Sequence, residues 1–185
     1  AHNNLSALEA HLKKAKEQQP LKRPLVITES LFSMEGTTAP IKEISVLCTK
    51  YDSKLLIDEA HAFGIMGSQG RGETFGIKEP ISIISGTFGK AFGGGGAFLA
   101  TDKKLGEHLI QTCGAFRYTT ALAPPLCASA LAALKLIRNN PSWGIKLQEE
   151  SIEWRDALSE NGWQRPPGHG PIISIILGSD EKAID

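Results

Sequence analysis

The stretch from residue 82 to residue 100 constrains the fold of this chain most, because two apolar runs flank a glycine-rich turn. The first run is rich in β-branched residues and predicts a buried strand. Residues 93–96 are all glycine, and such a segment loses much conformational entropy on folding. It therefore indicates positive φ angles or the close approach of a ligand. The turn also contains one lysine, Lys90, and we expect the turn to present its amine.

Lys90 is open to several interpretations. A surface lysine in a flexible loop is the commonest one. A phosphate-binding loop is excluded because Ile84 stands where that pattern requires glycine, and Ala91 stands where it requires serine or threonine. A dinucleotide-binding pattern that starts at Gly93 fails at Phe98. A lysine on a rigid turn also forms Schiff bases with carbonyl compounds, including the aldehyde of pyridoxal phosphate, and this interpretation accounts best for the glycines.

Apolar strand segments alternate with amphipathic helix segments as far as residue 100. The expected order before the glycine-rich stretch is helix 5–15, strand 25–30, helix 41–48 and strand 54–61. This alternation predicts an α/β fold with a largely parallel sheet sandwiched by helices, and ligands bind beyond the carboxyl ends of strands in such sheets. Ser33, Asp58 and His61 lie at or just after two such ends. Lys90 follows another, and we therefore expect the four side chains to share one crevice.

Past residue 100 the chain predicts mostly helices. A cap at Asp102 starts one helix, Pro124 opens a second, and a third ends at Asn161. The apolar run 171–177 follows a segment rich in proline and glycine, and it predicts one further strand.

Charge and composition argue against several classes of protein. The 185 residues include 20 basic and 20 acidic ones, which gives no electrostatic reason to expect a nucleic acid or an anionic membrane as partner. No apolar run approaches the length of a membrane span. The cysteines, Cys48, Cys113 and Cys127, are odd in number and lack metal-ligand spacing. We therefore expect reduced core thiols, no metal site and a cytoplasmic protein.

Residues 58–61 spell Asp-Glu-Ala-His and match the DEAH box of helicases. An ATP-driven motor also needs a phosphate-binding loop and a surface suited to nucleic acid, and the sequence provides neither. A DEAH-type ATPase is therefore only a remote alternative.

Five segments, in the same order along the chain, resemble the α-oxoamine synthases, which are pyridoxal-phosphate-dependent enzymes of fold type I. The matching segments are residues 33–36, 58–61, 64–72, 86–90 and 116–121. They extend from residue 33 to residue 121. Within the family, residues 87–93 are most similar to the branch that makes 8-amino-7-oxononanoate for biotin synthesis.

The resemblance implies a domain organisation. Residues 1–140 are expected to form part of the large pyridoxal-phosphate-binding domain. Residues 141–185 are expected to form a connecting helix and the start of a smaller α+β C-terminal domain. The family's ring-stacking aromatic residue and its carboxylate-binding arginine are expected outside these residues, so the chain resembles a segment of a longer protein and is expected to be inactive alone.

The resemblance also implies roles for three residues of the expected crevice. Lys90 corresponds to the lysine that binds the cofactor aldehyde covalently and later moves the α-proton of the substrate. Asp58 corresponds to the carboxylate that faces the pyridine nitrogen and keeps it protonated, so that the ring accepts electrons. His61 corresponds to the histidine near the phenolic oxygen of the cofactor. We therefore expect Lys90, His61 and Asp58 to be catalytic and to bind the cofactor.

Three hydroxyl residues complete the implied site. Ser33 corresponds to a serine that contacts cofactor or substrate, and Thr87 corresponds to a threonine that binds the cofactor phosphate. Thr119, or alternatively Thr120, corresponds to a residue whose hydroxyl binds the phosphate of the cofactor in the other subunit. The resemblance thus implies a homodimer whose active sites are shared between the subunits.

The implied activity is that of a pyridoxal-phosphate-dependent acyltransferase. Such an enzyme condenses an amino acid, L-alanine in the biotin branch, with an acyl thioester, pimeloyl-coenzyme A or a pimeloyl-carrier protein, and releases carbon dioxide. Glycine C-acetyltransferase, 5-aminolevulinate synthase and serine palmitoyltransferase share this chemistry and are the alternatives. A non-catalytic subunit of the family is disfavoured, because such subunits typically lose the lysine that Lys90 matches.

Overall fold

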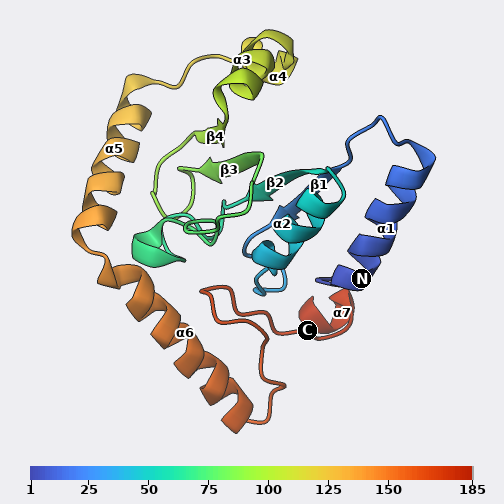
Figure 1. Ribbon diagram of the computed structural model, residues 1–185. Coiled ribbons are helices and arrows are strands. Elements are labelled where there is room, and N and C mark those ends of the chain that lie inside the picture. Colours follow the sequence, from blue (N-terminus) through green and yellow to red (C-terminus); the bar gives the residue numbers. More distant parts are fainter. Residues whose placement is uncertain (185) are drawn as a thin grey trace.

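The computed structural model describes residues 1–184 and contains a four-stranded sheet with helices around it (Figure 1). The strands lie in the order β1-β2-β3-β4, and their bounds are β1 Leu25–Glu29, β2 Lys54–Asp58, β3 Ile83–Thr87 and β4 Ala97–Thr101. β1, β2 and β3 are parallel, whereas β4 runs antiparallel to β3 because the glycine-rich turn reverses the chain directly. The prediction of an α/β fold with a largely parallel sheet is confirmed.

One face of the sheet packs against the first two helices, α1 Leu5–Gln18 and α2 Ile41–Lys50, which lie side by side (Figure 1). Ile44 and Cys48 of α2 pack with Leu55 and Ile57 of β2 to form the main core. Because successive side chains of a strand alternate between faces, Asp58 at the end of β2 belongs to the opposite face.

The helices of the second half begin and end close to where local signals place them. Their bounds are α3 Lys103–Thr112, α4 Gly114–Arg117, α5 Pro124–Asn139, α6 Ser142–Glu160 and α7 Asp180–Ile184. A short 3₁₀ helix, η1 Ser68–Gly70, lies earlier, between β2 and β3. Asp102 caps α3, because its Oδ1 accepts a hydrogen bond of 2.9 Å from the Leu105 amide. Pro124 opens α5 and Asn161 follows the end of α6, as predicted.

The apolar run 171–177 does not form a strand, and this prediction was wrong. Arg155 of α6, which is fully buried, donates from Nη2 to the Ile172 carbonyl at 2.6 Å. Ser174 donates from Oγ to the Met34 carbonyl, and Gly36 lies so close that a side chain there would collide with the Ile172 carbonyl oxygen. The run is therefore fixed by a guanidinium and by a turn instead of by a neighbouring strand.

The cysteines differ in their environments. Cys48 is buried in the core, and burial raises the pKa of its thiol to about 11. Cys113 is partly buried, but Cys127 is exposed on α5, so the prediction of a core thiol was wrong for Cys127. All three are free thiols.

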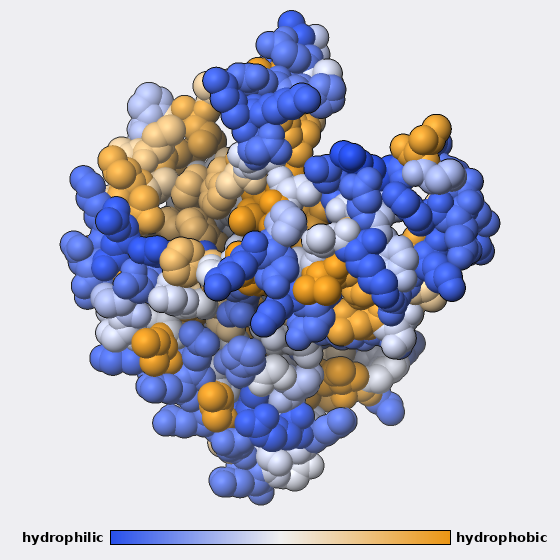
Figure 2. All heavy atoms as spheres, viewed as in Figure 1, coloured by the Kyte–Doolittle hydropathy of each residue, from blue (hydrophilic) through white to orange (hydrophobic). Residues whose placement is uncertain are grey.

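Apolar side chains remain exposed over α5 and α6. Figure 2, viewed as Figure 1, shows hydrophobic residues gathered at the upper left, where α5 lies. The larger exposed apolar side chains of these two helices are Leu126, Leu131, Leu134, Leu136, Trp143, Ile145, Leu147, Ile152 and Trp154. Among residues 1–184, no helix combines the length and the apolar character that a membrane span requires.

Candidate active site

Side chains at the carboxyl ends of the parallel strands form one row across the open face of the sheet. Glu29 of β1 pairs in register with Asp58 of β2, and Asp58 pairs in register with Ser85 of β3. Ser85 in turn pairs with Leu99 of β4. Residues paired in register project to the same face, so the row begins with two carboxylates and ends in an apolar side chain.

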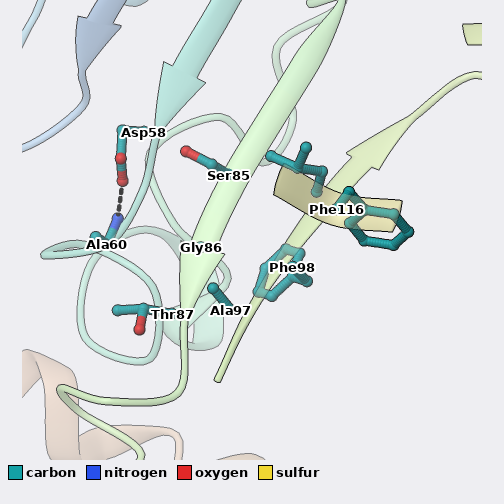
Figure 3. Close-up of a pocket in the computed structure, with 9 residues that line it drawn as sticks. Asp58, Ala60, Ser85, Gly86, Thr87, Ala97, Phe98 and Phe116 are labelled. Atoms are coloured by element: carbon teal, nitrogen blue, oxygen red, sulfur yellow. Dashed lines mark hydrogen bonds between the residues drawn. The ribbon is translucent and has the colours of Figure 1, made fainter. Parts of the chain in front are cut away.

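A hollow of about 260 Å³ lies on this face, between the strand ends and α4. It is lined by Asp58, Ala60, Ser85, Gly86, Thr87, Ala97, Phe98, Leu99 and Phe116. Figure 3 shows Asp58 on one side of the hollow and the rings of Phe98 and Phe116 on the side away from it. A small molecule with a cationic end and an apolar ring matches this distribution of charge.

Asp58 turns the chain as well as facing the hollow. Its Oδ1 accepts a hydrogen bond of 2.7 Å from the Ala60 amide, which directs the backbone away from β2 (Figure 3). Among the described residues, no hydrogen bond involves Oδ2 of Asp58. One oxygen of this carboxylate thus has a structural partner, and the other remains available to a ligand.

Thr87 closes the glycine-rich turn that follows β3. Its Oγ1 donates to the Gly96 carbonyl at 3.0 Å and accepts from the Gly89 amide at 3.1 Å. Gly93 and Gly96 adopt positive φ angles of 59° and 100°, as the glycine run predicts. The hydroxyl is therefore part of the turn, and it would exchange the Gly96 carbonyl for another acceptor in order to donate to a ligand.

Lys90 and His61 interact electrostatically near the two carboxylates, although neither lines the hollow. The pKa of His61 is lowered, first by burial and next by the positive charge of Lys90. The negative charges of Glu29 and Asp58 oppose this shift. Lys90 itself is exposed on the turn, and no ion pair among the described residues involves it.

Ser33 lies on the turn that follows β1, where Glu29 binds it. The Ser33 amide donates to Oε2 of Glu29 at 3.0 Å, and the Ser33 hydroxyl lies 3.4 Å from Oε1. Sequence reasoning missed Glu29. The available signal was its position at the end of a strand, which is the rule that identified Asp58.

Thr119 and Thr120 lie apart from this cluster. Both are exposed beyond the end of α4, and neither lines the hollow, although Phe116 of α4 does. The structure thus brings Asp58 and Thr87 to the hollow, and it brings His61 and Lys90 within electrostatic reach of each other. The role of Thr119 at the phosphate of another subunit stays a prediction.

Glu59, the second residue of the segment that resembles a DEAH box, is 1% exposed and was also missed. Its carboxylate accepts hydrogen bonds from the Ser30 hydroxyl at 2.7 Å, the Thr74 amide at 2.6 Å and the Glu73 amide at 3.2 Å. A side chain at Gly72 would lie 2.7 Å from the Glu59 carboxyl carbon. Glu59 therefore ties the loop after β2 to the end of β1 and is not available to a ligand.

No group of three or more histidine, cysteine, aspartate or glutamate residues within residues 1–184 is arranged to hold a metal ion.

Comparison with known proteins gives a consistent set of relatives. The family model for class I and II aminotransferases matches residues 1–185. The 8-amino-7-oxononanoate synthase of Methylobacillus flagellatus is 37% identical over 186 residues, which cover 100% of this chain and 46% of that protein. The enzyme of the same name from Nitrosospira multiformis is 38% identical over 99% of this chain and 46% of its own length. The chain thus spans about half the length of the curated relatives it matches.

Solved structures agree with this result. The serine palmitoyltransferase of S. paucimobilis, with a bound PLP–myriocin aldimine, superposes with a TM-score of 0.87 at 26% identity, over 97% of this chain and 47% of that one. The 8-amino-7-oxononanoate synthase of Francisella tularensis superposes with a TM-score of 0.81 at 28% identity, over 99% of this chain and 52% of that one.

Proposed function

We propose that this chain carries the cofactor-binding part of a pyridoxal-phosphate-dependent acyltransferase, because it belongs to the class I and II aminotransferase family and resembles its α-oxoamine synthases. The fold is the fold type I that the sequence predicts. The observation that carries the proposal is the hollow that Asp58 and Thr87 line, with His61 and Lys90 on the loops that follow the same two strands, β2 and β3.

The residues present fit pyridoxal phosphate by their donor chemistry. Asp58 presents a carboxylate oxygen that lacks a partner among the described residues, which suits a protonated ring nitrogen. Lys90 presents a primary amine outside every ion pair of those residues, which suits an aldehyde. Thr87 presents a hydroxyl beside the glycine-rich turn, which suits a phosphate. Leu99 and Phe116, which line the hollow, supply the apolar wall that an aromatic ring requires.

Each of these side chains has a distinct task in the proposed reaction. When bound, pyridoxal phosphate supplies an electron sink that stabilises negative charge at the α-carbon of an amino acid. Asp58 would hold a proton on the ring nitrogen, and Thr87 would bind the phosphate. The Lys90 amine would hold the aldehyde until the amino group of the substrate displaces it, and the freed amine would then accept the α-proton. His61 holds an oxygen atom of the cofactor or substrate by a hydrogen bond. Ser33 contacts the cofactor or the substrate.

The substrates that we propose are an amino acid, L-alanine, and a pimeloyl thioester, which condense with loss of carbon dioxide. The support is that the curated relatives from Methylobacillus and Nitrosospira carry the name 8-amino-7-oxononanoate synthase. The likeness to serine palmitoyltransferase keeps serine and a longer acyl chain as the alternative. Product analysis with alanine, glycine and serine against several acyl-coenzyme A donors separates these activities.

We further propose a cytoplasmic homodimer whose large domain includes residues 1–140 and whose smaller domain starts within residues 141–185. The three free thiols support a reducing compartment. The exposed apolar side chains of α5 and α6 support a subunit or domain interface.

The test of the cofactor assignment uses borohydride, which reduces a Schiff base to a stable secondary amine. We expect the purified full-length protein to show a visible absorbance band with pyridoxal phosphate and, after reduction, a mass adduct on the peptide that contains Lys90. Lys90→Ala is expected to lose band, adduct and turnover. Lys104→Ala, which removes an exposed lysine of α3, is the matched control and is expected to keep all three. A Lys90→Ala protein that retains turnover would sink the assignment.

A further inference from the structure

β1 ends in a carboxylate, Glu29, to which the proposed reaction assigns no role. Glu29 is half-buried and pairs in register with Asp58, so both carboxylates lie on the same face and at the same edge of the sheet. Its position therefore makes Glu29 a direct neighbour of the residue that is proposed to hold the ring nitrogen.

Glu29 fixes the turn that contains Ser33. Both of its carboxylate oxygens face this one residue, Oε2 at 3.0 Å from the amide nitrogen and Oε1 at 3.4 Å from the hydroxyl oxygen. The same turn is closed by two backbone hydrogen bonds, from the Gly36 amide to the Phe32 carbonyl at 3.0 Å and from the Phe32 amide to the Thr37 carbonyl at 2.9 Å. The Glu29 side chain of β1 thus helps to orient the Ser33 hydroxyl.

Glu29 also acts on His61. The charges that face this imidazole come from three elements: Glu29 from β1, Asp58 from β2 and Lys90 from the turn after β3. Burial and Lys90 lower the pKa of His61, whereas Glu29 and, to a lesser extent, Asp58 raise it. A protonated imidazole donates from both ring nitrogens, so a negative charge near it favours the donor form.

We propose that Glu29 is a positioning residue of this site, whose carboxylate fixes Ser33 and supplies the negative charge that faces His61 from β1. The inference rests on the proposed function, because the roles of Ser33 and His61 come from it. The hydrogen bonds with Ser33 and the effect of the Glu29 charge on His61 belong to the chain itself and are measurable without cofactor or substrate. Glu29 acts through these two residues and does not touch the reacting atoms.

Two variants distinguish the effect of the negative charge of Glu29 from the effect of the length of its side chain. Glu29→Gln keeps an oxygen acceptor at nearly the same place and removes the charge. Glu29→Asp keeps the charge and withdraws it by one methylene group. Glu35→Gln, which neutralises an exposed carboxylate on the same turn, is the matched control.

The first measurement is an NMR titration of His61 in the full-length protein without pyridoxal phosphate. We expect the pKa of His61 to fall in Glu29→Gln, because a contribution that raises it is lost, and to stay unchanged in Glu35→Gln. An unchanged His61 pKa in Glu29→Gln overturns the proposal, and so does an equal fall in both variants, which would reflect only the net charge.

The second measurement is hydrogen exchange of the Ser33 amide. In Glu29→Asp, the Ser33 amide is expected to exchange faster, while the pKa of His61 stays close to its parent value. In Glu29→Gln, the Ser33 amide is expected to exchange at about the parent rate, while the pKa of His61 falls. Unchanged protection of Ser33 in Glu29→Asp overturns the proposal even if Glu29→Gln fails to fold. Failure of the proposed function appears instead in the borohydride experiment at Lys90, which leaves both measurements intact.

Discussion

Glu73, a partly buried residue beside the buried Glu59, links the stability of this fold to pH. Burial, and next the neighbouring Glu59, raise the pKa of Glu73 above its ordinary value, against the opposing charge of His169. The folded state therefore favours the protonated carboxyl. The resulting contribution to the free energy of unfolding is complete below the unfolded pKa of about 4.3, and it is lost as the pH rises through the folded pKa.

Glu73→Gln tests this linkage, since glutamine stays neutral at every pH. We expect the variant to be more stable than the parent protein at pH 7 and to lose this advantage below about pH 4. Urea unfolding at a series of pH values measures both effects. Glu35→Gln is the control and is expected to change the free energy of unfolding by less than about 0.5 kcal/mol. Lower stability of Glu73→Gln at neutral pH would contradict the expectation.

A site residue is predictable from sequence when its position follows from adjacent residues of the chain, and it is not when its position depends on pairing with a distant segment. Asp58 and Lys90 follow apolar runs directly, so their positions at strand ends were predictable. The strand-end rule also applied to Glu29, but its pairing with Asp58 was not predictable, because the register of β1 against β2 is defined only in the assembled sheet. Glu59 was missed for the same kind of reason, because its partner Ser30 lies on another strand end.

Among the elements, the turn between β3 and β4 depends on glycine at residue 96. We expect Gly96→Ala to cost about 1–3 kcal/mol of stability, because φ at Gly96 is 100° and an added Cβ would lie 2.5 Å from Leu122 Cδ1. Gly106→Ala in α3 is the control, and it is expected to stabilise the protein by up to about 1 kcal/mol since helical alanine is favoured over glycine. Urea unfolding measures both, and a Gly96→Ala protein as stable as the parent would refute the expectation.

Elements whose ends depend on local chemistry were predictable, whereas one that depends on a distant partner was not. The Asn4 side chain caps α1 by accepting from the Ala7 amide at 2.8 Å, and Asp102 caps α3 in the same way. Residues 171–177 have the apolar pattern of a strand, but the Ile172 carbonyl accepts a hydrogen bond from Arg155 of α6, and no strand among the described residues pairs with the run. The apolar pattern of a segment predicts that the segment is buried. Whether it also forms a strand depends on whether another strand lies beside it and completes the backbone hydrogen bonds.

At the scale of the whole molecule, the exposed apolar side chains of α5 and α6 require an explanation. Trp143 and Trp154 are 52% and 66% exposed, and Leu131 of α5 is 53% exposed. Apolar side chains gathered on a surface, as they are over α5 in Figure 2, are typical of contact with another domain or subunit. The proposed homodimer would provide such a contact. It also leads to a prediction about the function of Thr119, which lies just before α5.

If Thr119 serves the active site of the other subunit, two defective chains should complement each other. A mixed dimer of Lys90→Ala and Thr119→Ala has one site with both defects and one with none, because the lysine and the threonine of each site come from different chains. Random reassociation is expected to restore about a quarter of the parent activity, since half of the dimers are mixed and each has one intact site. Thr120→Ala in place of Thr119→Ala tests the alternative hydroxyl. Activity no higher than the mean of the separate variants would place the hydroxyl and Lys90 on the same subunit and remove the reason for a shared site.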